Sequence, residues 1–176
     1  FINTTAVASN GGGLSFINCF IPITLIGNKF SFGYAYIGAS ILVNIATSIS
    51  ISNCEFSNNR AKEYGGAISL SKVLGNASIS DSKFFNNSIT KGKGGSIYSE
   101  NTILSIVNTE FSDLKDSINL DNCEAKAIYS YCSDPLKNSF TLTKVDFIGM
   151  KSYNGIIVIY NSYSIIGYGY FSAQNV

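Results

Sequence analysis

The chain has 176 residues, of which 13% are charged, and it carries a formal net charge of +1 with no histidine. A nucleic-acid-binding surface needs clustered cations to neutralise phosphates, and Arg60 is the only arginine, so the composition argues against that partner. No stretch approaches about 18 consecutive apolar residues, so no membrane-spanning helix and no membrane insertion by this segment is expected.

Phenylalanine recurs along the chain at intervals of 29, 26, 28, 27, 36 and 24 residues. The positions are Phe1, Phe30, Phe56, Phe84, Phe111, Phe147 and Phe171. An aliphatic residue stands five positions before each of the last six, at Leu25, Ile51, Ile79, Ile106, Leu142 and Ile166. The residues between alternate with polar ones, which predicts a strand with one buried face in every period. A period of this length is typical of stacked repeats.

Two kinds of turn separate the predicted strands. Asn53, Asp81 and Asn108 lie three residues before a phenylalanine, which indicates a bend stabilised by side-chain bonds to nearby backbone. Paired glycines precede a second apolar segment, and their conformational freedom suits the turn that enters the next strand. These pairs are Gly12 and Gly13, Gly65 and Gly66, and Gly94 and Gly95. Each period therefore holds at least two short strands and two turns.

These patterns predict an all-β fold, a right-handed parallel β-helix of about six rungs over residues 1–176 as a single segment. Equivalent residues would stack about 4.8 Å apart in ladders, and several periods together would form a continuous core. The expected ladders contain Phe30, Phe56, Phe84, Phe111 and Phe147; Ile51, Ile79, Ile106 and Leu142; and Asn53, Asp81 and Asn108. A right-handed coil is predicted because crossover connections between parallel strands are strongly biased to that hand. A tandem array of antiparallel hairpins explains the alternation but not the recurrence of one residue at one phase.

Both ends fall near whole rungs, and solenoid ends need covering. We expect either a segment of a longer solenoid or a subunit whose ends meet other copies.

The period 111–147 is irregular, because it is about nine residues longer than its neighbours. The surplus falls in 116–124 and 133–139, and Lys126 stands where the pattern expects a glycine such as Gly95. Insertions in a solenoid often carry an interaction surface. A tolerated loop without function is the equally open alternative.

The four cysteines predict neither a disulfide nor a metal site. Cys123 and Cys132 flank a predicted strand, and at about 3.3 Å per residue they lie too far apart to be bridged unless the segment folds back. Cys54 takes a position held by small polar residues in neighbouring periods, which indicates a core residue, and Cys19 has no partner in phase. With no histidine and no metal-ligand spacing, we expect no metal and no cofactor.

Three Asn-x-Ser/Thr sequences are candidate glycosylation sites, at Asn3, Asn76 and Asn86. Asn86 lies in the turn after Phe84, where a glycan would project freely, and is the preferred position of the three.

An enzyme is not expected. Polysaccharide hydrolysis or elimination needs clustered acidic groups, whereas the eleven carboxylates here are scattered. Glu55, Lys83 and Glu110 each precede a ladder phenylalanine, and their alternating sign indicates a surface ion-pair ladder. Asp113 with Asp116, or Asp121 with Glu124, are the remaining acidic pairs, and nothing else converges on them. A polysaccharide lyase or hydrolase is the least favoured alternative.

The segments Phe56-Ser57-Asn58-Asn59, Phe84-Phe85-Asn86-Asn87 and Gly65-Gly66-Ala67-Ile68 resemble the FxxN and GGA(I/L/V) repeats of the polymorphic outer membrane proteins. That family consists of surface-displayed β-helices with adhesive roles. The resemblance implies a non-catalytic extracellular or cell-surface protein that contacts host cells, matrix or glycans. FxxN is complete only in the two central periods, and GGA(I/L/V) is complete in one of them. A fibre subunit that stacks end to end on copies of itself is the alternative.

Overall fold

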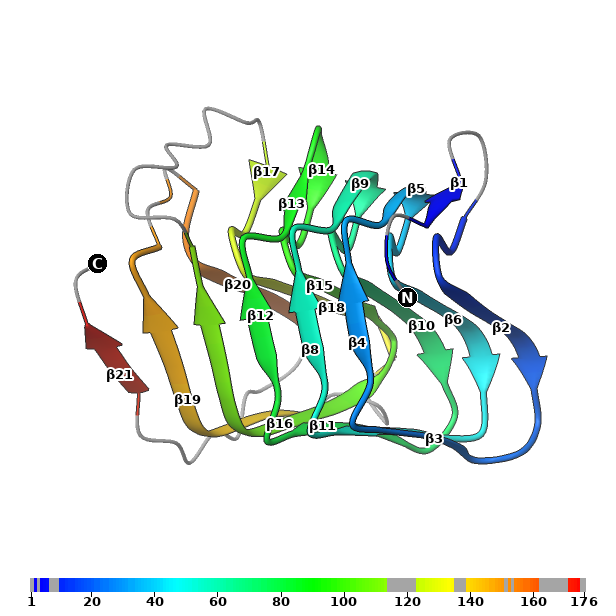
Figure 1. Ribbon diagram of the computed structural model, residues 1–176. Helices are drawn as coiled ribbons and strands as arrows, with labels where there is room; N and C mark the ends of the chain where they lie inside the picture. The colour runs from blue at the N-terminus through cyan, green and yellow to red at the C-terminus, as the bar shows by residue number, and fades with distance from the viewer. Residues whose placement is uncertain are drawn as a thin grey trace.

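The computed structural model describes residues 2, 4–6, 10–113, 123–134, 139–150, 152, 154–161 and 171–174. Over these residues the chain is a β-solenoid of about five turns, without helices and with parallel sheets throughout (Figure 1). This confirms the predicted parallel β-helix and rules out antiparallel hairpins for the described residues. The right-handed sense and the sixth rung stay predictions.

Three sheets form the sides of the solenoid. The first contains β1 (Thr5–Ala6), β5 (Tyr34–Ile37), β9 (Arg60–Tyr64), β13 (Ser88–Ile89), β14 (Gly92–Lys93) and β17 (Cys123–Glu124). The second contains β2 (Leu14–Cys19), β6 (Ile41–Ala46), β10 (Ile68–Val73), β15 (Ile97–Glu100), β18 (Ile128–Cys132) and β20 (Ile157–Asn161). The third contains β3 (Ile23–Ile26), β4 (Lys29–Ser31), β7 (Ile49–Ser52), β8 (Glu55–Ser57), β11 (Asn76–Ser80), β12 (Lys83–Phe85), β16 (Ile103–Ser112), β19 (Phe140–Ile148) and β21 (Phe171–Gln174).

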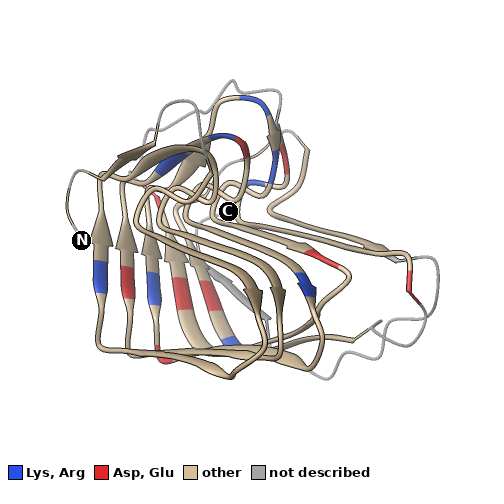
Figure 2. Ribbon diagram, turned by 90° about the vertical axis from the view of Figure 1, so that its right-hand side faces the viewer, with Lys and Arg blue, Asp and Glu red and all other residues tan. Residues whose placement is uncertain are grey.

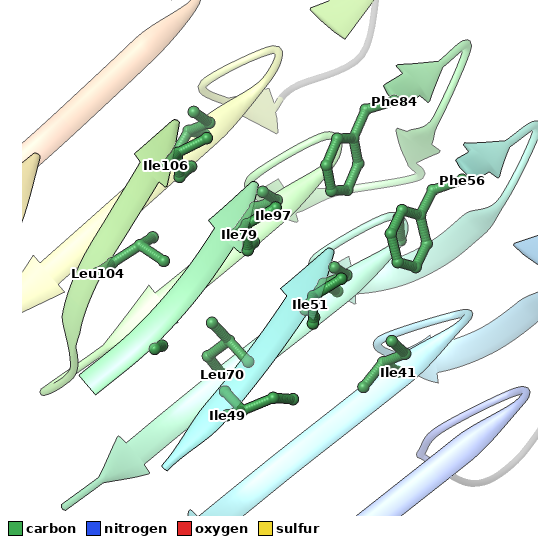
Figure 3. Close-up of a cluster of buried hydrophobic side chains, with 14 of the residues drawn as sticks. Ile41, Ile49, Ile51, Phe56, Leu70, Ile79, Phe84, Ile97, Leu104 and Ile106 are labelled. Carbon is green, nitrogen blue, oxygen red and sulfur yellow. The ribbon is translucent and has the colours of Figure 1, made fainter. Parts of the chain in front are cut away.

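The core consists of columns of like side chains that run along the solenoid (Figure 3). Successive rings of the phenylalanine column lie nearly parallel, with centroids 5.1, 4.7, 4.7 and 5.3 Å apart. The column is Phe30, Phe56, Phe84, Phe111 and Phe147. Beside it runs the aliphatic column Leu25, Ile51, Ile79, Ile106 and Leu142. One rung buries little alone, so each rung is stabilised chiefly by its two neighbours.

The recurrence of phenylalanine in the sequence does not extend the column beyond Phe147. Phe171 pairs with Val145, and Ala173 takes the place opposite Phe147. The sheet keeps a spacing of 26 residues here, the same as between Phe30 and Phe56. Phe171 follows Phe147 by only 24 residues and so arrives two positions early. Phe1 and Ile166 lie outside the described residues.

The glycine turns also need one correction of register. Leu14 pairs with Ile41, and Ile41 pairs with Ile68, so Gly11 rather than Gly12 is equivalent to Gly65. Gly11, Gly65 and Gly94 share a positive φ of +73°, +60° and +73°. The second glycine of each pair serves close approach: a β-carbon on Gly66 would lie 1.9 Å from the carbonyl oxygen of Gly95 on the next rung. The sequence has three consecutive glycines at 11–13, so it did not show which two of them are equivalent to Gly65 and Gly66.

Gly65 and Gly27 form a matched pair for testing this turn, because both have positive φ but only Gly65 is crowded. A β-carbon on Gly65 would lie 2.0 Å from the carbonyl oxygen of Ile68, whereas nothing lies within 4 Å of one on Gly27. We expect Gly27→Ala to lower the free energy of unfolding by about 1–2 kcal/mol through backbone strain. Gly65→Ala should cost about 1–3 kcal/mol more, because the chain must shift. If the two variants lost the same free energy of unfolding in urea denaturation, crowding around Gly65 would not matter, and this interpretation of the turn would be contradicted.

Candidate interaction surface

The FxxN motif forms an internal asparagine ladder that ties neighbouring rungs together. The side-chain amides of Asn59 and Asn87, both 1% exposed, donate to the carbonyl oxygens of Phe30 (3.0 Å) and Phe56 (2.8 Å) on the preceding rung. The backbone N–H of Asn59 donates to Oδ1 of Asn87 at 3.0 Å. Buried amides that satisfy backbone groups in this way stabilise the turn. From the sequence, Asn59 and Asn87 were identified only as the last residues of the FxxN motif, although their fixed position after each phenylalanine was a signal of the ladder.

A second polar column lies on the outside of the third sheet. Asn53, Asp81 and Asn108 have positive φ values of +52°, +48° and +48°, as expected of bends, and all three are exposed. The amide of Asn108 donates to Oδ1 of Asp81 at 2.6 Å. This bond joins two rungs, whereas the sequence led us to expect a bond to nearby backbone.

The charged residues that precede the phenylalanines also lie in register (Figure 2). Nζ of Lys29 lies 2.9 Å from Oε2 of Glu55, and both side chains are well exposed, so the pair contributes at most about 1 kcal/mol. Lys83 lies between Glu55 and Glu110, and Glu110 then pairs with Asp146 of the same sign. Alternation of sign therefore ends at that rung.

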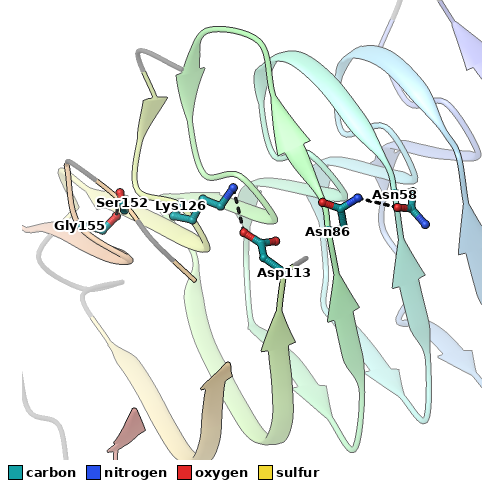
Figure 4. A network of polar contacts seen from close by, with 6 residues as sticks. All are labelled: Asn58, Asn86, Asp113, Lys126, Ser152 and Gly155. Carbon is teal, nitrogen blue, oxygen red and sulfur yellow. Dashed lines mark hydrogen bonds and ion pairs between the residues drawn. The ribbon is translucent and has the colours of Figure 1, made fainter. Parts of the chain in front are cut away.

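The irregular rung replaces the glycine pair with Ala125 and Lys126, as the pairing of Ile97 with Ile128 shows. Lys126 turns inward and meets Asp113, with Nζ 2.9 Å from Oδ2 and side chains only 3% and 1% exposed (Figure 4). Asp113 takes the position that Asn86 holds in the rung before. A buried ion pair thus replaces the glycine and asparagine chemistry of the regular rungs.

Burial raises the pKa of Asp113 above its ordinary value of 3.8, and Lys126 opposes this shift. The carboxyl group of Asp113 therefore binds its proton more tightly in the folded state than in the unfolded state. The contribution of this protonation to the free energy of unfolding is complete below pH 3.8, the ordinary pKa. It is lost as the pH rises through the pKa of Asp113 in the folded state.

We therefore expect Asp113→Asn to abolish one pH-dependent loss of stability. The free energy of unfolding of the wild type minus that of the variant should fall as the pH rises from about 3 to about 8. Urea denaturation at each pH measures this difference, in which the contributions of the other carboxylates cancel. A difference that does not change with pH would show that Asp113 keeps its ordinary pKa.

A groove of about 380 Å³ lies on the outer side of the second sheet. Ser69 and Ser71 of β10 lie in it, and Tyr64 at the end of β9 lines it from the first sheet. The remaining lining residues are Asn10, Ile17, Ile37, Leu42, Asn44, Tyr98 and Glu100. Tyr64 packs against Tyr98 with ring centroids 4.8 Å apart, and Tyr98 stacks on Tyr129 at 5.9 Å. No pattern in the sequence singled out these residues, because they come from different columns.

Of the candidate glycosylation sites, Asn76 is exposed at the start of β11. Asn86 is half-buried, and its Nδ2 donates to Oδ1 of Asn58 at 2.7 Å, so the amide that a glycan would modify is already engaged. In the folded chain Asn76 is thus the more accessible of the two described positions, and glycosylation of either stays a prediction. Asn3 lies outside the described residues.

Cys54 and Cys132 are buried, and Cys19 is half-buried. The side chain of Cys123 lies outside the described residues, as do the predicted insertion residues Asp116 and Asp121. Over the described ranges, no group of three or more His, Cys, Asp or Glu side chains could hold a metal ion. The same ranges contain no helix with the length and apolar character needed to cross a membrane.

Residues 53–71 match the Chlamydia polymorphic membrane protein (Chlamydia_PMP) repeat. The match runs from the bend at Asn53 through Phe56, Asn59 and the glycine pair into β10. Comparison with curated proteins and with solved structures finds no match. The repeat and the parallel β-solenoid together fit a β-helix repeat protein similar to that family.

Proposed function

We propose that the chain is the β-helical part of a cell-surface protein and that it acts by adhesion rather than catalysis. The observation that carries this proposal is the matched repeat, whose family name refers to membrane proteins. Within the match, Phe56, Asn59 and Gly66 are all engaged in packing or in contacts between rungs. These motif residues maintain the scaffold, so recognition falls to the outer side chains, which change from rung to rung.

The described carboxylates support a non-catalytic role. Acid–base cleavage of a glycan needs two carboxyl groups on either side of one bond. Here Glu55 is paired with Lys29, and Asp113 is buried against Lys126. Glu110 and Asp146 line a depression of about 400 Å³ on the outer side of the third sheet, but they stand next to each other in one ladder rather than on opposite sides of a bond.

Attachment of beads tests the adhesive function. Beads that carry the full chain should bind cultured epithelial cells or matrix-coated plates more than beads that carry the same chain after heat unfolding. Equal attachment of both would overturn the proposal. Release of reducing or unsaturated sugars from polysaccharides by the chain would overturn its non-catalytic part.

End-to-end assembly is the second candidate function. Within the described residues, β2 and β3 pair on one side only, with β6 and β7. Ile17, Phe20 and Ile26 of this rung are 59–69% exposed. Open strands flanked by apolar side chains favour association with another copy. Light scattering after size exclusion tests this, because a monomer at high concentration would contradict stacking and filaments in electron micrographs would support it.

A further inference from the structure

The groove on the second sheet owes its shape to small side chains between larger ones. Ser69 pairs with Leu42 on one side and with Tyr98 on the other. Ser71 lies in the same way between Asn44 and Glu100. The lining runs from Ile17 of β2 to Tyr98 and Glu100 of β15, so the depression spans four neighbouring rungs, or roughly 14 Å at the spacing of strands. This length suits two or three sugar units, and the volume of about 380 Å³ lies within the range of small-ligand sites.

The lining combines aromatic rings with neutral hydrogen-bonding groups. Tyr64 and Tyr98 supply apolar ring surface, and Asn44 and Ser71 supply amide and hydroxyl groups. The Oγ of Ser71 donates to Oε2 of Glu100 at 3.0 Å, which fixes the orientation of the carboxylate. Burial raises the pKa of Tyr98, so its hydroxyl stays neutral at physiological pH. Rings beside several hydrogen-bonding groups match the apolar faces and hydroxyl edges of a pyranose.

Charge and backbone pairing narrow the class of ligand. The described residues that line the groove include one carboxylate, Glu100, and no lysine or arginine, which disfavours sulfated, sialylated or phosphorylated ligands. β6 pairs with both β2 and β10, and β10 pairs with both β6 and β15. Along β6 and β10 a peptide therefore finds no free strand edge to extend, and recognition over these two strands must use side chains.

We infer that this groove binds a short neutral oligosaccharide, an inference that rests on the proposed adhesive function and specifies its ligand. Tyr64 forms the aromatic side wall, and Glu100 accepts hydrogen bonds from sugar hydroxyls. Asn44 and Ser71 supply the remaining polar contacts.

Calorimetric titration of the full chain with maltotriose, cellotriose, chitotriose and N-acetyllactosamine tests the inference, with a heparin tetrasaccharide as the anionic comparison. At least one neutral sugar should bind, and Tyr64→Ala and Glu100→Gln should each weaken that binding about ten-fold or more. Tyr160→Ala is the matched control, because Tyr160 is an exposed tyrosine on the same sheet that does not line the groove. This variant should bind as the wild type does.

A groove-filling variant keeps the test decisive if Tyr64→Ala perturbs the fold. Ser71→Tyr places a ring in the groove at a column position that already holds tyrosine in two later rungs, Tyr131 and Tyr160. It should fold normally by circular dichroism and lose sugar binding. The inference fails if no neutral sugar binds at millimolar concentration, if Ser71→Tyr binds unchanged, or if heparin binds more tightly.

The two proposals fail separately. Beads that attach to cells while no sugar binds would overturn the sugar site and leave adhesion standing. Sugar binding by a chain whose beads do not attach to cells would overturn adhesion and leave the sugar site standing.

Discussion

Phe84→Ala is expected to lower the free energy of unfolding by about 3–5 kcal/mol, since a buried aromatic side chain is lost and a cavity remains. Phe84 is 1% exposed and stacks on both sides, against Phe56 and Phe111, with ring centroids 4.7 Å away in each direction. Its removal therefore weakens two interfaces between rungs at once. Urea denaturation followed by circular dichroism measures the loss.

Phe20→Ala provides the control for this prediction. Phe20 is 69% exposed, so the same substitution should change the free energy of unfolding by no more than about 0.5 kcal/mol. If both variants lost the same stability, the phenylalanine column would not be the main support of the solenoid.

Lys126→Met should have the second large effect, a loss of about 3–5 kcal/mol, because it leaves the buried carboxylate of Asp113 without its partner. The length of the side chain is nearly kept, so the loss reports mainly on charge. The same denaturation measurement applies. A cost below about 1 kcal/mol would indicate a solvated pair.

The double variant Asp113→Leu with Lys126→Met tests the cause. Replacing both charges of a buried pair with apolar groups is often neutral, because neither charge is then desolvated. We expect the double variant to recover most of the stability that Lys126→Met loses. Additive losses would mean that the two side chains act independently of each other.

The columns could be predicted from the sequence because a parallel coil turns each recurring residue into a neighbour of its equivalent. Ile51, Ile79 and Ile106 recur with regular spacing, and their strands pair in the expected register. Phe171 does not follow this pattern, because strand pairing depends on the number of residues that one turn of the solenoid needs. Phe171 comes two residues too soon after Phe147, and the sheet keeps its register instead of shifting to place the two phenylalanines side by side.

The ion pair and the groove could not be predicted in the same way. Lys126 stood out as the wrong residue for its position, but Asp113 belongs to another column, and nothing in the spacing joins the two. The groove is lined by Tyr64 of the first sheet and by Tyr98 of the second, whose rings pack together. Such contacts depend on the angle at which two sheets meet. Periodicity reports which residues are equivalent, and it carries no information about neighbouring columns.

Because the rungs are structurally equivalent, whole repeats could be lost or gained during evolution. Deleting residues 57–84 would remove one full repeat, and Phe56 would then come to lie against Phe111 just as Phe84 does now. Recombination between repeats could therefore shorten or extend the molecule in steps of about 4.8 Å without inventing a new fold. The length of the solenoid can thus change while the outer side chains of the remaining rungs stay as they are.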